Sequence, residues 1–148
     1  MEEKLNLAQE WNKVFPQSYK INHSKITFRN RYGISLAADL YMPKNIEGKL
    51  PAIAVCGPFG AVKEQASGLY AQVLAEHGFL TIAFDPSFTG ESGGTPRYVA
   101  SPDINTEDFC AAVDYLSIRD DVDAGKKLPD IFFCVGNNDF LIESVDRF

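Results

Sequence analysis

Hydrophobic and polar positions alternate differently along successive parts of the chain. Residues 2–14 carry apolar side chains at helical spacing and predict a helix that Pro16 ends. Residues 19–28 and 34–42 alternate on either side of a turn that contains Gly33, which predicts an antiparallel hairpin. The apolar positions of the predicted helix are Leu7, Trp11 and Val14.

Three later runs, residues 51–57, 79–84 and 130–136, are largely apolar and show no alternation of apolar and polar positions. Such runs predict strands that are buried on both faces, as in a parallel sheet covered by helices. Helices are expected between them at residues 63–77 and 105–118, the second capped by Asn105 or Thr106. The core stripe of the first helix is predicted to be Leu69, Val73 and Leu74.

This order of elements predicts a single domain over residues 1–148 with a three-layer α/β fold. An antiparallel hairpin would precede a mostly parallel sheet, with the two helices on opposite faces. We further expect strand 130–136 to pair with strand 51–57. That strand would be a sheet edge and a surface for self-association.

Composition and charge narrow the class of protein. The chain has 148 residues, with 14 basic and 20 acidic side chains and a net charge of −6, which disfavours nucleic acid and acidic membranes as partners. No apolar run is long enough to span a bilayer, and the first fifteen residues do not resemble a signal peptide. The three cysteines are expected to be reduced and buried, in a cytoplasmic protein: Cys56, Cys110 and Cys134.

Candidate chemistry lies where the predicted parallel strands end, because ligands bind at the carboxyl ends of such strands. The Gly57–Gly60 turn has two free N–H groups, those of Phe59 and Gly60, that could stabilise an oxyanion. It could equally be a plain strand-to-helix turn. Asp139 follows the last predicted strand and could orient a histidine or simply close a turn.

The sequence around Ser92, GESGG, matches the G-x-S-x-G pattern of a nucleophile elbow. That motif needs a strand immediately before the serine and a helix immediately after it. Here loop residues separate Gly90 from the predicted strand, and Pro96 follows soon after. We therefore expect Ser92 to be part of a loop turn.

Other common sites find little support in the sequence. His23 lies within the hairpin and His77 ends a helix at the wrong edge of the sheet, so neither is expected to be a general base. The cysteines lack metal-ligand spacing, and no dinucleotide- or nucleotide-binding loop is present. The sequence predicts neither a metal site nor a cofactor.

The segment PAIAVCGPFGAVKEQASGLYAQVLAEHGFLTIAFDPSFTGESGG resembles the N-terminal half of α/β-hydrolases of the dienelactone-hydrolase-like group. The likeness extends over about residues 20–124. It implies that G-P-x-G-x-V-K-E-Q is the oxyanion turn, with Phe59 as N–H donor, and that Ser92 lies in the loop after the fourth strand. Residues 128–148 resemble the triad-acid segment of esterase-type members, which implies that Asp139 is the acid.

The resemblance also implies parts that we do not find in this sequence. The family pattern places a nucleophile elbow soon after the region near Lys126 and a catalytic histidine beyond the acid. We therefore expect an internally truncated ester or dienelactone hydrolase that is inactive as it stands. The alternatives are a non-catalytic binding module on the same fold, and an active hydrolase that uses Ser92. Its substrate, if any, would be a small ester.

Overall fold

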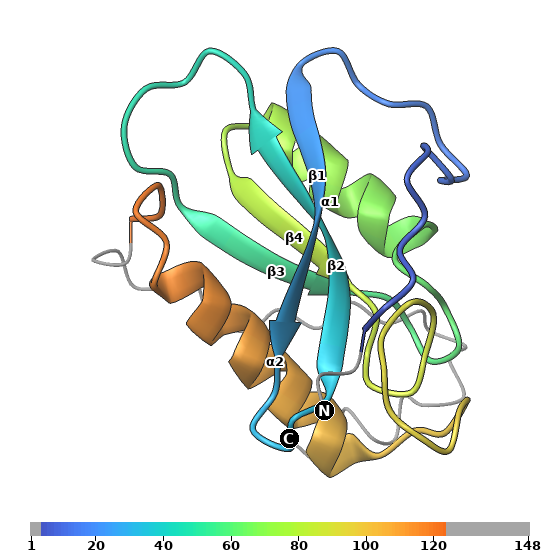
Figure 1. Ribbon diagram of the computed structural model, residues 1–148. Coiled ribbons are helices and arrows are strands. Elements are labelled where there is room, and N and C mark those ends of the chain that lie inside the picture. The colour runs from blue at the N-terminus through green and yellow to red at the C-terminus, as the bar shows by residue number, and fades with distance from the viewer. Residues whose placement is uncertain (1–3, 124–148) are drawn as a thin grey trace, which may run out of the picture.

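The computed structural model describes residues 4–123, which form a four-stranded sheet with one helix on each side. The strands are β1 (Ile21–Arg29), β2 (Ser35–Pro43), β3 (Ala52–Cys56) and β4 (Leu80–Phe84). The helices are α1 (Ala66–Glu76), between β3 and β4, and α2 (Pro102–Ser117). Figure 1 shows α1 and α2 on opposite sides of the strands, α1 at the upper right and α2 at the lower left.

The sheet has the order β1-β2-β4-β3. β1 and β2 form the predicted antiparallel hairpin, with Ile21 opposite Pro43 and Arg29 opposite Ser35. β2 is antiparallel to β4, whereas β3 and β4 are parallel. The three-layer α/β fold is thus confirmed, and within residues 4–123 the sheet is mixed. Strand 130–136, its pairing and its proposed self-association lie outside the described residues.

The two faces of the sheet have separate cores, which confirms that the helices cover opposite sides. On the α2 side, Leu36, Ile82 and Phe84 pack against Ala112 and other small residues of the helix. On the α1 side, Ile21, Tyr41 and Ala83 pack against Ala71 and Ala75. Side chains alternate between faces along a strand, so one hairpin supplies residues to both cores.

The predicted helix at residues 2–14 is wrong over the part that the structure describes. Residues 4–16, which we call the N-terminal segment, contain no helix. The backbone N–H of Ala8 donates to the Glu91 carboxylate (2.6 Å), and that of Val14 to the Glu64 carbonyl (3.1 Å). These long-range hydrogen bonds take the place of the local i to i−4 bonds that a helix would need.

The core stripe predicted for α1 is also wrong, because Leu69 and Val73 are 43% and 41% exposed. The buried face carries small and polar residues instead: Ser67, Gly68, Ala71, Gln72 and Ala75. A Cβ added at Gly68 would lie 2.3 Å from the Lys63 carbonyl oxygen and 3.0 Å from the Tyr41 hydroxyl. The helix therefore approaches the sheet too closely for large side chains.

α2 begins earlier than the sequence predicts, with Ser101 as N-cap and Pro102 in the first turn. Proline fits there because its missing N–H is not needed by the helix. Cys110 on α2 is exposed, against the prediction, because it lies on the solvent side of the helix. Cys56 is half-buried, and burial raises the pKa of its thiol to about 12. Cys134 lies outside the described residues.

Candidate functional site

The carboxyl ends of β3 and β4 bring together the two loops that the sequence singled out. The Gly57–Gly60 turn leaves β3 at Cys56, and the loop that begins at Asp85 leaves β4 at Phe84, the register partner of Cys56. The candidate oxyanion turn and the G-x-S-x-G loop therefore start side by side at the carboxyl ends of β3 and β4.

The Gly57–Gly60 turn is tight and carries an exposed aromatic side chain. The Ala61 N–H donates to the Pro58 carbonyl (3.0 Å), and Gly60 has φ +80°, a conformation that glycine adopts without strain. The Phe59 side chain is 66% exposed. Within residues 4–123, the N–H groups of Phe59 and Gly60 donate to no other group. Both are therefore available to a ligand.

Lys63 fastens this turn to the loop after β4. Its side chain is fully buried, and its ammonium group contacts Glu64 (2.7 Å), Asp85 (2.8 Å) and Glu91 (2.8 Å). Its backbone N–H donates to the other oxygen of Asp85 (2.8 Å). Burial opposes the ammonium charge, but the carboxylates outweigh it and raise the pKa of Lys63.

The carboxylates of this cluster are held by several donors at once. Burial raises the pKa of Asp85, while the Lys63 ammonium and the Glu91 N–H (2.9 Å) favour its ionised form. Burial also opposes the charge on Glu91, but the Ala8 N–H, Lys25 and Lys63 outweigh it and lower the pKa to about 2. These contacts join the segment after the Gly57–Gly60 turn to the loop after β4.

Ser92 is part of the loop, as the sequence predicts. It is only 2% exposed, its hydroxyl donates to the Asp85 carbonyl (2.7 Å) and its oxygen accepts the Ala37 N–H (2.8 Å). Gly90 has φ +54°, and a Cβ there would lie 2.2 Å from a carboxylate oxygen of Asp85. Gly90, the first glycine of G-x-S-x-G, thus permits a close turn around Asp85, and the Ser92 hydroxyl bonds to the backbone on both sides of it.

A second buried cluster holds the start of this loop against α2. Asp108 of α2 is fully buried and accepts hydrogen bonds from the backbone and hydroxyl of Ser87 (2.8 Å each) and from Asn30 (2.8 Å). These hydrogen bonds join the start of the loop after β4 to α2 and to the turn between β1 and β2.

Neither histidine reaches these loops. His77 caps the far end of α1, as predicted, with Nδ1 2.8 Å from the Val73 carbonyl. His23 lies on the α1 side of β1, where it contacts Asp39. Asp139 lies outside the described residues. No group of three metal-ligating side chains occurs within residues 4–123.

The sequence analysis missed the role of Lys63, Asp85 and Asp39. A signal existed for the first two, since Lys63 belongs to the G-P-x-G-x-V-K-E-Q segment and Asp85 directly follows a largely apolar strand. Asp39 stands among apolar residues of β2, and its full burial is apparent only from the pairing of β1, β2 and β4.

Comparison with known proteins agrees with this geometry. An uncharacterised Pseudomonas aeruginosa protein, PA2218, is 70% identical over 119 residues, which cover 80% of this chain and 32% of that protein. Its crystal structure superposes with a TM-score of 0.80 and 68% identity, over 82% of this chain and 38% of that one. The thiohydrolase aneE of Aspergillus aculeatus is 33% identical over 101 residues, 68% of this chain and 31% of that protein.

A structure of the enzyme Est1E from Butyrivibrio proteoclasticus with bound ferulic acid superposes with a TM-score of 0.57 and 29% identity. It matches 66% of this chain and 39% of that one. The chain spans about a third of the length of the curated relatives it matches.

No helix in the described part of the chain is long and apolar enough to cross a membrane. The profile of the X-Pro dipeptidyl-peptidase (S15) family matches residues 32–126, more than half of the sequence. The three-layer fold, the turn after β3 and these matches agree: the chain belongs to the S15 family of the α/β-hydrolase superfamily.

Proposed function

We propose that this chain carries the oxyanion-binding half of a hydrolase that transfers an acyl group from an ester or thioester to water. The observation that carries this is the Gly57–Gly60 turn, with two uncommitted N–H groups at the carboxyl end of β3. Donors held in advance toward a developing oxyanion stabilise the tetrahedral intermediate of acyl transfer. The finer assignment to the dienelactone-hydrolase-like type and a cytoplasmic location belong to the same proposal.

The remaining chemistry would come from groups other than those of residues 4–123. Ser92 is an unsuitable nucleophile, because its hydroxyl is buried and donates to the Asp85 carbonyl rather than to a base. Asp139 is proposed as the acid that orients a histidine. We propose accordingly that the chain alone does not turn over esters.

The first test is hydrolysis of an activated acetate ester by the purified chain, with fluorophosphonate labelling of serine. We expect no turnover above the buffer rate and no stoichiometric label. Turnover that disappears in Ser92→Ala but persists in Ser117→Ala would contradict this expectation and identify Ser92 as the nucleophile. Ser117 is a matched control because its hydroxyl is exposed and bonds only within α2.

The second test addresses the turn itself and needs no turnover. Methylphosphonate, a tetrahedral oxyanion, is titrated into the ¹⁵N-labelled chain. We expect the amide signals of Phe59 and Gly60 to move and saturate. Gly48 and Gly78 serve as controls, since they also have positive φ but lie just before β3 and β4, at the opposite end of these strands. Equal shifts at all four amides, or none, would contradict the oxyanion turn and favour a binding module that uses another surface.

A further inference from the structure

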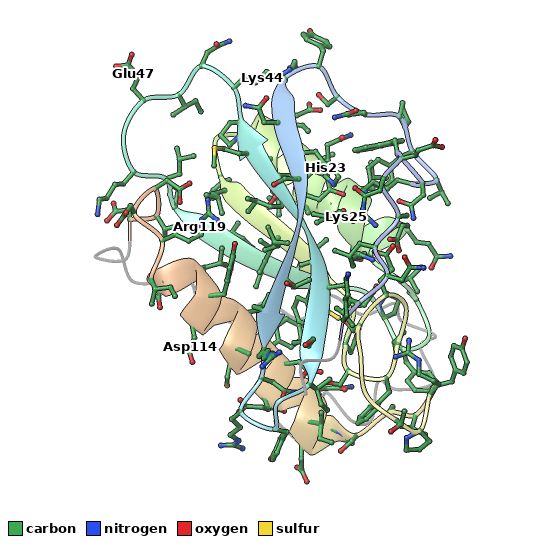
Figure 2. The ribbon with its side chains drawn as sticks, in the orientation of Figure 1. His23, Lys25, Lys44, Glu47, Asp114 and Arg119 are labelled. Atoms are coloured by element: carbon green, nitrogen blue, oxygen red, sulfur yellow. The ribbon has the colours of Figure 1, made fainter. Side chains whose placement is uncertain are left out.

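A cavity of about 380 Å³ lies between the N-terminal segment and β1, outside the Gly57–Gly60 turn and next to the charged cluster, because its lining residues Ala8 and Lys25 both bond to Glu91. Small-molecule sites have volumes of about 300–1,000 Å³, so the cavity is large enough for a compact ligand. Trp11 and Glu10 line one wall, and His23 and Lys25 of β1 line the other. Figure 2 shows these two β1 residues on the side of the strand toward the N-terminal segment.

The cavity is separate from the oxyanion turn. His23 pairs with Tyr41, and Tyr41 pairs with Thr81, near the start of β4. The Gly57–Gly60 turn lies at the opposite end of these strands, next to Phe84. A ligand in the cavity would therefore contact a different part of the sheet from an ester at the turn.

His23 is fixed so that one ring nitrogen is free. Its Nε2 is 2.7 Å from Asp39, whose fully buried carboxylate also pairs with Lys13 (3.0 Å). Burial opposes the charge on Asp39, but His23 and Lys13 outweigh it and lower the pKa of Asp39. An ionised carboxylate only accepts hydrogen bonds, so Nε2 donates to Asp39, and in the tautomer whose proton is on Nε2 the other ring nitrogen, Nδ1, is an acceptor. Nδ1 has no partner within residues 4–123.

The side-chain N–H donors that line the cavity already bond to other groups of the protein, whereas some hydrogen-bond acceptors have no partner among the described residues. The Glu10 carboxylate is exposed and takes part in no hydrogen bond or ion pair among the described residues. The side chains of Gln17 and Ser24 can either donate or accept hydrogen bonds, so they favour neither a cation nor an anion. Lys25 donates to Glu91 (2.6 Å), Trp11 to the Phe15 carbonyl (2.7 Å) and Gln9 to the Leu7 carbonyl (3.0 Å).

The charges behind the cavity favour a cation as well. Within residues 4–123, the ion pairs that adjoin it join four carboxylates to three ammonium groups, which leaves one negative charge even before Glu10 is counted. The carboxylates are those of Asp39, Glu64, Asp85 and Glu91, and the ammonium groups those of Lys13, Lys25 and Lys63.

From these observations we propose that the cavity binds a small organic cation with N–H donors, a primary ammonium being the simplest. The ammonium group would donate to His23 Nδ1 and pair with Glu10. The proposal is independent of the proposed hydrolase function, because it uses none of the residues of the oxyanion turn.

The test is a titration of the whole chain with n-butylammonium chloride, followed by NMR of the histidine rings and the Trp11 indole. The chain has two histidines and one tryptophan, so each signal can be assigned and His77 is an internal control. We expect saturable shifts at His23 and Trp11 and none at His77. Butyrate and 1-butanol, of similar size, are expected to bind at least several-fold more weakly.

Glu10→Gln removes one acceptor charge with little change of shape and should weaken butylammonium binding about 1.5- to 5-fold, as for other exposed ion pairs. Glu47→Gln changes an exposed carboxylate in the loop between β2 and β3, far from the cavity in Figure 2, and should bind like the unmodified chain. Equal shifts at His77, binding of butyrate or butanol as tight as that of the amine, or unchanged binding in Glu10→Gln would each overturn the proposal.

Discussion

The two faces of one sheet are stabilised in different ways. Under α2, strand residues such as Leu36, Ile82 and Phe84 meet alanines and a leucine, and the core is apolar. Under α1 and the N-terminal segment, the same strands bury Asp39 and Thr81, and the loop after β4 buries Asp85. The apolar face depends on the area removed from water, while the charged face depends on every charge having its partner.

This difference coincides with the place of the candidate site. The charged cluster joins the N-terminal segment, the oxyanion turn and the loop after β4, whereas the apolar core under α2 joins mainly the sheet and α2, with Leu50 and Val122 beside them. Ion pairs and hydrogen bonds are directional, so they fix loops more specifically than apolar contacts do.

Replacement of Lys63 is expected to have the largest effect. Lys63→Met keeps the length of the side chain but leaves Asp85 buried without its ammonium partner. The free energy of unfolding should fall by about 3–5 kcal/mol, as when one partner of a buried pair is removed. Urea denaturation measures this change.

Lys44→Met is the matched control, because Lys44 is exposed and bonds only to the Tyr19 carbonyl. Its unfolding free energy should stay within about 0.5 kcal/mol of the unmodified chain. If Lys63→Met were no less stable than Lys44→Met, the charged face would not depend on its ion pairs.

The second prediction concerns the hydroxyl that braces the loop. Ser92→Ala removes the acceptor of the buried Ala37 N–H, which should cost about 1–3 kcal/mol of unfolding free energy. Thermal or urea unfolding of Ser92→Ala and Ser117→Ala checks this, and we expect little change in the second. Equal stability of the two variants would show that Ser92 is not structural.

The third prediction tests the apolar face. Ile82→Val removes one methylene group from the fully buried core under α2 and should cost about 0.5–1.5 kcal/mol. The cost should change little with pH, because the cluster around Ile82 is made of apolar side chains, and the buried carboxylate of α2, Asp108, is held by Ser87 and Asn30. Ile118→Val, at a position 81% exposed, should be neutral. Carboxylates titrate between about pH 3 and pH 7. A cost for Ile82→Val that varied strongly over that range would contradict the difference between the apolar and the charged face.

Much of the fold could be predicted from the sequence because the relevant patterns are local. The hairpin follows from alternation around Gly33, and β3 and β4 follow from runs without alternation. The N-terminal segment could not be predicted, since its apolar residues have helical spacing but its backbone bonds to distant residues such as Glu64 and Glu91. Likewise, the stripe at Leu69 and Val73 suggested a core face that the close approach at Gly68 rules out.

Some features of the candidate site could likewise be predicted from the sequence, and others could not. The structural role of Ser92 followed from the sequence, because Gly90 and Pro96 bracket it in a loop. The burial of Lys63 could not be foreseen, since it depends on Asp85 and Glu91, which reach it only through the pairing of β3 with β4. Charged residues are normally exposed, so their burial is apparent only once their partners are located.

The smallest expected effect is a change in the acid sensitivity of the charged face. The pKa of Glu91 is lowered to about 2 in the folded chain from a usual value of 4.5, chiefly because the Ala8 N–H, Lys25 and Lys63 outweigh the effect of burial. A carboxylate with a depressed folded pKa contributes stability that is fully present above 4.5 and is lost as the pH falls toward about 2. Glu91→Gln should therefore flatten the dependence of unfolding free energy on pH within that window, because its cost is largest above pH 4.5 and disappears toward about pH 2. The cost stays modest because Glu91 is partly exposed. Urea denaturation at several pH values measures the slope, and Glu47→Gln should keep the unmodified slope because its carboxylate is exposed. If Glu91→Gln kept that slope as well, the ion pairs of Glu91 would contribute nothing to folding, and the N-terminal segment would be held by Trp11 and Phe15 rather than by charge.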